Sequence, residues 1–248
     1  GEGYWQGALS IFEYYSSNTS ESFSLFADTS YKVSDSLTVG AGVRYFEDTA
    51  TETLGGVEDV PDTFTSVDPR FYLSYAATED VNVYASVSKG FRSGGFNGFG
   101  LPSFDPEKVW SYELGTKGSF LDGALYLDFA GFYTQYNAMQ VRSLILVGGG
   151  VGLTSVISNI GKGVIKGLEL SFNWKATDAL TISGNGTIMD AEITEAGDGG
   201  TFMDGSPIDY VADASFTLSA NYDFNWTDEM PGFVRVDYSY RDKLPYTF

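Results

Sequence analysis

Apolar and polar side chains alternate at every second position along most of this chain. The alternation is regular from 168 to 175, where four apolar side chains are interleaved with four polar ones. Because successive side chains of a β-strand point to opposite faces, such a segment has one apolar face and one polar face. The same pattern recurs at 22–28, 81–88, 125–129 and 215–222. The sequence therefore predicts an all-β protein made of amphipathic strands.

The alternating segments and the turn residues between them predict about eleven strands, with ends uncertain by roughly two to four residues. We expect the strands near 3–13, 20–32, 37–47, 68–77, 81–91, 108–118, 124–141, 158–174, 180–193, 211–223 and 232–242. The connectors alternate in length: 33–36, 77–80, 120–123 and 176–179 are short, whereas 48–66, 92–107, 142–157 and 194–209 are long. Short turns on one side and long loops on the other are typical of outer-membrane β-barrels.

The hydropathy of the chain agrees with strands that cross a membrane. The mean hydropathy is -0.09 and 16% of the residues are aromatic. No run approaches the roughly 18 uncharged apolar residues that a transmembrane helix requires. A barrel strand alternates lipid-facing and lumen-facing side chains, so its overall hydropathy is modest. We therefore predict an antiparallel transmembrane β-barrel segment with short periplasmic turns and long extracellular loops. Aromatic residues near the strand ends would form interfacial belts, although they also suit any strand.

Several kinds of chemistry are excluded by composition. Histidine and cysteine are both absent, which removes the Ser-His-Asp triad, histidine-bound zinc and thiolate sites. We therefore expect no catalytic residues, no metal site and no cofactor, and we do not expect an enzyme. The net charge of -19 argues against nucleic acid as a partner, because phosphate binding requires clustered Lys and Arg.

Several stretches resemble the β-barrel of TonB-dependent outer-membrane receptors. The strongest match is VYASVSKGFRSGGFN at 83–97, which resembles the family's strand that rises into a Gly-rich external loop. PEKVWSYELGTK at 106–117 and FAGFYTQY at 129–136 look like the descending strand and its return. NIGKG at 159–163, KGLEL at 166–170 and YSYRD at 238–242 match further recurrent stretches. Their order and spacing together are specific to this family.

The resemblance implies a receptor in the outer membrane of a Gram-negative bacterium. Such a receptor imports a scarce small-molecule ligand, such as a siderophore or another metal chelate, with energy from a TonB-type coupling protein that acts through a plug domain. A complete barrel of this type has about 22 strands. We therefore expect residues 1–248 to be the middle-to-late part of the barrel, truncated at both ends and lacking the plug. The alternatives are a free-standing barrel of about twelve strands, either an autotransporter translocator or a porin-like channel, and an outer-membrane barrel enzyme, which the missing histidine disfavours.

Candidate site residues lie in the loops and on the polar face. In the Gly-rich loop 90–100, which lacks the ending of a phosphate-binding loop, the residues available to touch ligand are Arg92, Phe96, Asn97 and Phe99. The alternative is that they only pack the loop against its neighbours. Three charged residues at polar-face positions are expected to face the lumen, because charge facing lipid is costly: Arg44, Asp128 and Glu169. Pairing with plug charges is the alternative to a role in the solute path.

Acidic residues crowd two of the expected loops. They are Glu47, Asp48, Glu52, Glu58, Asp59 and Asp62 in one, and Asp198, Asp204 and Asp209 in the other. Carboxylates suit calcium, but neither loop has EF-hand spacing. A solvated, self-repelling loop is the simpler interpretation, and calcium binding stays open.

Overall fold

The computed structural model describes residues 16–54, 57–97, 101–147, 152–196 and 203–246. These residues form the strands β1 (Ser16–Lys32), β2 (Leu37–Leu54), β3 (Val57–Ala76), β4 (Val81–Arg92), β5 (Gly95–Asn97), β6 (Leu101–Phe104), β7 (Glu107–Phe120), β8 (Leu125–Val147), β9 (Gly152–Lys175), β10 (Leu180–Glu195), β11 (Ala214–Thr227) and β12 (Met230–Arg241). No helix in these ranges is long and apolar enough to cross a membrane.

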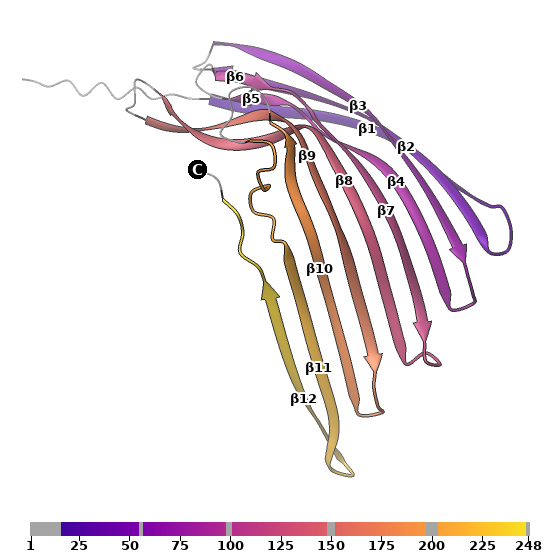
Figure 1. The fold of residues 1–248 in the computed structure, drawn as a ribbon. Coiled ribbons are helices and arrows are strands. Elements are labelled where there is room, and N and C mark those ends of the chain that lie inside the picture. Colours follow the sequence, from indigo (N-terminus) through magenta and orange to yellow (C-terminus); the bar gives the residue numbers. More distant parts are fainter. Residues whose placement is uncertain (1–15, 55–56, 98–100, 148–151, 197–202, 247–248) are drawn as a thin grey trace, which may run out of the picture.

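Ten of the strands form one antiparallel sheet in which each strand lies beside the next long strand of the chain. The order is β1-β2-β3-β4-β7-β8-β9-β10-β11-β12, and β5 pairs with β6 in a separate hairpin (Figure 1). The strands lie side by side in a curved sheet, with the short turns at one end and the hairpin at the other (Figure 1). This arrangement confirms the predicted all-β antiparallel fold. Ten predicted strands correspond to the ten strands of the sheet, and the strand expected near 3–13 lies outside the described residues.

Two of the predicted long loops are wrong in extent. Within 48–66, β2 continues to Leu54 and β3 begins at Val57; within 142–157, β8 continues to Val147 and β9 begins at Gly152. β-branched residues at alternate positions, such as Thr49, Thr51 and Thr53, favour strand over loop. The predicted loop 92–107 was not expected to contain strands, yet it holds the β5–β6 hairpin. The strands thus extend further toward the long-loop end than apolar alternation alone indicates.

The register gives the sheet one apolar face and one polar face. On the apolar face, a row across the sheet passes through Leu73, Leu114, Leu168 and Ile188. These large side chains are well exposed: Leu114 is 62% exposed and Ile188 58%. Exposed apolar surface on this scale is unfavourable in water and suits contact with lipid.

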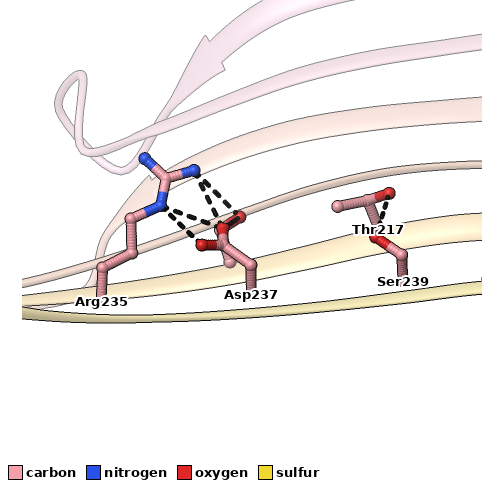
Figure 2. Close-up of polar contacts among 5 residues, drawn as sticks. Thr217, Arg235, Asp237 and Ser239 are labelled. Carbon is pink, nitrogen blue, oxygen red and sulfur yellow. Dashed lines mark hydrogen bonds and ion pairs between the residues drawn. The ribbon is translucent and has the colours of Figure 1, made fainter.

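The polar face is illustrated by the pair β11–β12. Arg235, Asp237, Thr217 and Ser239 all project from the same face of the pair (Figure 2). The Arg235 guanidinium donates to the Asp237 carboxylate, with Nε 2.9 Å from Oδ1, and the Thr217 and Ser239 hydroxyls lie 3.2 Å apart. The polar side chains of this face therefore satisfy one another, both along β12 and across to β11, as expected of a wall that faces water or a polar lumen.

A small apolar core lies at the long-loop end of β9 and β10. Ile160, Ala191, Ile193 and Ile208 are buried together there. Ile208 belongs to the segment 203–213, which follows the upper part of β10 where β11 no longer pairs with it. The Ile208 N–H donates to the Ala191 carbonyl at 3.1 Å. The segment therefore covers an edge of β10 that would otherwise be unpaired.

The ladder between β3 and β4 ends early. The two strands pair only up to Arg70 and Ser88, although both continue toward the long-loop end. Pro69 lies at this point, and a proline has no N–H to donate to a neighbouring strand. Beyond it, the Lys89 ammonium donates to the Val67 carbonyl at 2.7 Å. A side chain thus joins the strands where the backbone ladder has ended.

Candidate ligand-binding hairpin and polar wall

The β5–β6 hairpin packs closely because two of its residues have no side chain. A Cβ on Gly94 would overlap the Phe104 carbonyl and would lie 2.7 Å from a ring carbon of Phe64 in β3. A Cβ on Gly95 would lie 2.8 Å from the Phe104 ring. Phe64 is only 8% exposed. The glycines therefore allow the hairpin to lie against β3 on one side.

Asn97 fixes the hairpin on its other side. Its Nδ2 donates to the Pro102 carbonyl within the hairpin and to the Ile157 carbonyl in β9, both at 2.7 Å. Its Oδ1 accepts from the Ile157 N–H at 2.8 Å. Because Asn97 is 6% exposed, these bonds are well shielded from water. The amide imitates a backbone ladder step and links the hairpin to β9.

Two more amides strengthen the same attachment. The Gln140 Nε2 donates to the Ser93 carbonyl at 2.8 Å and to the Asp105 carbonyl at 3.1 Å. Asn159 Oδ1 accepts from the Asp105 N–H at 2.6 Å, and its Nδ2 donates to the Asp105 and Ala138 carbonyls, both at 2.8 Å. Ala138 has a left-handed φ of 52°, which is strained for a residue with a Cβ. Asn97, Gln140 and Asn159 are called the amide latch below.

Sequence reasoning named only one member of the latch. Asn97 was predicted to touch ligand, whereas the structure commits its amide to the loop and β9. Gln140 was missed because nothing in a lone glutamine indicates its partner. Asn159 begins the NIGKG stretch that was noted as recurrent, so a signal for it was present.

The other candidate loop residues are differently placed. Arg92 is the last residue of β4, is exposed, and lies opposite Glu107 of β7. Phe96 is half-buried in β5. Phe99 lies outside the described residues. Arg92 therefore has the more accessible side chain of the two that can be examined, and their contact with a ligand stays a prediction.

The charged residues expected to face the lumen share the polar face. Asp128 lies 3.0 Å from the Lys117 ammonium, which is its cross-strand neighbour. Glu169 lies in the next row of the same face, opposite Thr187. Arg44 lies opposite Asp68, and its guanidinium carbon is 4.8 Å from the centre of the Phe46 ring. Their part in a solute path stays a prediction.

The C-terminal segment covers the end of the segment 203–213. The Tyr210 N–H donates to the Pro245 carbonyl at 3.0 Å, and the Tyr210 and Tyr246 rings lie 5.3 Å apart. Desolvation raises the pKa of Tyr210, with a further contribution from its hydrogen bond with Tyr246. Tyr210 therefore stays neutral and keeps its hydroxyl proton for hydrogen bonding at physiological pH.

Several acidic residues of the predicted loops make separate contacts with neighbouring groups, and the side chains of Glu58 and Asp59 lie outside the described part of the chain. Within the described ranges, no group of three or more carboxylates is close enough to hold a metal ion. Asp48 instead accepts a hydrogen bond from Ser20, and Asp204 accepts one from the Ala196 N–H at 2.8 Å. Asp198 lies outside the described residues.

These features together define a class of protein. A meander of long antiparallel strands with an apolar face, a polar face, short turns at one end and attached loops at the other is the wall of an outer-membrane β-barrel.

The family profile described as "TonB dependent receptor-like, beta-barrel" matches residues 1–247. The chain is 30% identical over 188 residues to the pesticin receptor of Yersinia enterocolitica, a match that covers 71% of this chain and 27% of that receptor. Over 133 residues it is 30% identical to the metal-pseudopaline receptor CntO of Pseudomonas aeruginosa, covering 51% of this chain and 17% of the relative. The chain thus spans less than a third of the length of either relative.

Solved structures show the same fold. The ferric yersiniabactin uptake receptor FyuA from Yersinia pestis matches with a TM-score of 0.70 and 21% identity, over 91% of this chain and 38% of that one. This chain belongs to the TonB-dependent receptor β-barrel family. It is a protein of the Gram-negative outer membrane.

Proposed function

We propose that this chain is the middle-to-late part of the barrel of an outer-membrane receptor that imports a scarce ligand, such as a siderophore bound to its metal. The observation that carries the proposal is an amphipathic ten-stranded wall with a hairpin fastened across its long-loop end. Family membership and relatives that are named as receptors for a siderophore or a metal chelate support it. The proposed activity is binding and transport, not catalysis.

The proposal includes three partners. Outer-membrane lipid contacts the apolar face, where side chains such as Leu114 and Ile188 are exposed. A small-molecule metal chelate contacts the loops and the polar face. A TonB-type coupling protein in the inner membrane acts through a plug domain that is not among these residues. Nucleic acid is not a partner of a chain with a net charge of -19.

Within this proposal the candidate residues have distinct roles. Arg92, Phe96 and Phe99 contact the ligand from the hairpin region. Asn97 positions the hairpin, because its amide hydrogen bonds are made to Pro102 and Ile157. On the polar face, the solute path is lined by Arg44, Asp128 and Glu169.

Iron uptake tests the proposed function. The gene for the full-length receptor is deleted in its host, and cells are grown under iron limitation with radioactive iron added to their own culture supernatant. We expect uptake to fall on deletion, to return with the full-length gene, and to stop when a protonophore removes the proton-motive force. Unchanged uptake after deletion would contradict the proposal.

Behaviour of residues 1–248 alone tests the alternative of a free-standing barrel. Heat-modifiable migration in detergent together with stable pores in planar bilayers would favour that alternative over ours. We expect neither, because β1 and β12 are the unpaired edges of the described sheet and lipid does not tolerate open edges.

A further inference from the structure

Three carboxylates surround Ala50 on the polar face of β2 and β3. Asp48 and Glu52 lie two residues to either side of Ala50 in β2, so their side chains point to the same face as its methyl group. The cross-strand neighbours of Ala50 are Ser20 in β1 and Asp62 in β3. Asp62 is therefore a diagonal neighbour of both other carboxylates. Asp48, Glu52 and Asp62 are called the carboxylate cluster below.

Two members of the carboxylate cluster are buried although their side chains are ionisable. Glu52 is 6% exposed and Asp48 is 8% exposed. The Asp48 carboxylate accepts a hydrogen bond from the Ser20 hydroxyl, whereas the Glu52 Oε1 is buried with no hydrogen-bond partner. A buried carboxylate oxygen without a partner costs free energy, and native proteins avoid it unless a ligand or ion completes the site. The Glu52 Oε1 therefore points to a donor that comes from outside these strands.

The charge of the carboxylate cluster is not balanced by the described part of the chain. None of the ion pairs formed there involves any of the three carboxylates. The Lys89 ammonium reaches β3 but contacts Asp68 at 3.5 Å and the Val67 carbonyl at 2.7 Å. Like charges gathered at one place repel, and this repulsion is least screened where side chains are shielded from water. A positively charged group would therefore be attracted to the cluster.

The carboxylate cluster lies beside the hairpin, near the long-loop end of the wall. Ala50 is four residues from the end of β2 at Leu54. Phe64 is the cross-strand neighbour of Asp48, and Gly94 packs against the Phe64 ring at the start of the hairpin, where a Cβ would lie 2.7 Å from a ring carbon. A ligand that contacts the hairpin therefore has the carboxylate cluster within reach.

The spacing of the three carboxylates favours an organic cation over a bare metal ion. Diagonal neighbours such as Glu52 and Asp62 are roughly 7–8 Å apart, and Asp48 and Glu52, four residues apart in one strand, are separated by roughly 13 Å. Within the described ranges, no group of three carboxylates is close enough to hold a metal ion. An ammonium or guanidinium group carries several N–H donors that point in different directions. Such a group can donate to carboxylates that stand apart, whereas a metal ion requires its ligands at one short distance.

We propose that the carboxylate cluster binds a positively charged nitrogen group of the imported ligand, an ammonium or a guanidinium. The Glu52 Oε1 accepts one hydrogen bond from this group, and the exposed Asp62 carboxylate accepts another. Hydrogen bonds between an ionised donor and an ionised acceptor are stronger than those between neutral groups. The surrounding negative charge also attracts the cation before contact. This inference rests on the proposed function and adds the charge of one part of the ligand.

Dye binding to the purified full-length receptor in detergent tests the carboxylate cluster. The probe is dansylcadaverine, which carries an ammonium group, and dansylglycine is its anionic counterpart with the same fluorophore. We expect dansylcadaverine to bind more tightly than dansylglycine and its binding to be weakened by salt. The double variant Glu52→Gln, Asp62→Asn should bind dansylcadaverine about tenfold less tightly for each carboxylate that is lost.

A matched double variant controls for the loss of two negative charges. Asp35→Asn, Asp228→Asn changes exposed residues in two of the short turns, and it should leave the binding of dansylcadaverine unchanged. Equal loss of affinity in both double variants would overturn the inference, as would equal binding of the two dyes to the unaltered receptor. Displacement of dansylcadaverine by micromolar calcium would indicate a metal site and would also overturn it.

A lysine or arginine of the plug domain is the other source of a positively charged nitrogen group, and the melting temperature of the receptor separates the two sources. Removing a buried charge that has no partner should leave the melting temperature unchanged or raise it, whereas removing one partner of a buried ion pair should lower it. A lower melting temperature of the Glu52→Gln variant, with dansylcadaverine binding unchanged, would assign the carboxylate cluster to the plug and overturn the inference.

Cellular iron uptake separates this inference from the proposed function. If dansylcadaverine binding depends on Glu52 and Asp62 in a receptor that imports no iron, the proposed function fails and the cation site stands. If the double variant Glu52→Gln, Asp62→Asn loses dye binding but imports iron normally, the claim that the imported ligand uses the carboxylate cluster is overturned.

Discussion

Replacing Asn97 by alanine should open the attachment between the hairpin and β9. The substitution removes three hydrogen bonds, two donated to Pro102 and Ile157 and one accepted from the Ile157 N–H. The Pro102 bond lies within the hairpin, so only the two bonds to Ile157 hold Asn97 to β9. A net contribution of about 1 kcal/mol for each of these two bonds gives about 2 kcal/mol. This corresponds to an opening equilibrium roughly thirtyfold more favourable. The barrel ladder is not touched, so global stability should change little.

Hydrogen exchange of the full-length receptor in detergent, followed by mass spectrometry, measures this opening. The Ile157 amide reports directly, because its N–H donates to Asn97 at 2.8 Å. We expect its exchange to accelerate by roughly thirtyfold in Asn97→Ala. In the control variant Ser155→Ala, which changes an exposed residue of the same strand, the rate should stay as in the unaltered receptor. An unchanged rate at Ile157 would refute the reasoning, and so would an equal acceleration throughout the barrel, which would indicate general unfolding.

Three further substitutions test the wall. Gly40→Ala places a Cβ inside the Tyr72 ring and should lower the free energy of unfolding, measured in urea, by about 1–3 kcal/mol. Adding Tyr72→Ala should restore part of the lost stability. If the double variant recovers no stability, the contact between position 40 and the Tyr72 ring is contradicted. Leu170→Arg puts a charge on the apolar face and should cost about 2–4 kcal/mol in lipid vesicles, whereas Ser171→Arg on the polar face should cost little; equal costs would mean that the faces are misassigned. Lys89→Met removes the donor to the Val67 carbonyl and should speed hydrogen exchange in the upper part of β3 by about tenfold. An unchanged exchange rate would mean that the backbone ladder alone holds the two strands together.

The strands of the sheet could be predicted because their signal is local. Leu168, Leu170 and Phe172 alternate with polar residues in the sequence, and the structure places all three on one face. Because one face of the sheet contacts lipid and the other contacts a polar lumen, side chains must alternate between apolar and polar along each strand. Where the strands rise above the membrane this rule no longer applies. Thr51 and Glu52 therefore looked like loop, although they continue β2.

The amide latch could not be predicted in the same way. Gln140 and Ser93 lie 47 positions apart in the sequence, and Asn97 and Ile157 lie 60 apart. Such contacts depend on where the hairpin packs against the sheet, and nothing in the sequence indicates that position. Arg44 was assigned to the polar face from alternation, whereas its proximity to Arg70 depends on the register between β2 and β3.

The latch also changes which loop residues can select a ligand. A residue whose polar atoms are already used by the protein cannot exchange those bonds for a ligand without loss, so Asn97 is a poor candidate for direct recognition. Arg92 is exposed at the end of β4 and makes no ion pair among the described residues. Because the hairpin lies between Phe64 of β3 and Ile157 of β9, it is held from two directions. A ligand would then bind to a preformed surface. The conformational entropy of ordering the hairpin is lost when the protein folds, so it does not weaken ligand binding.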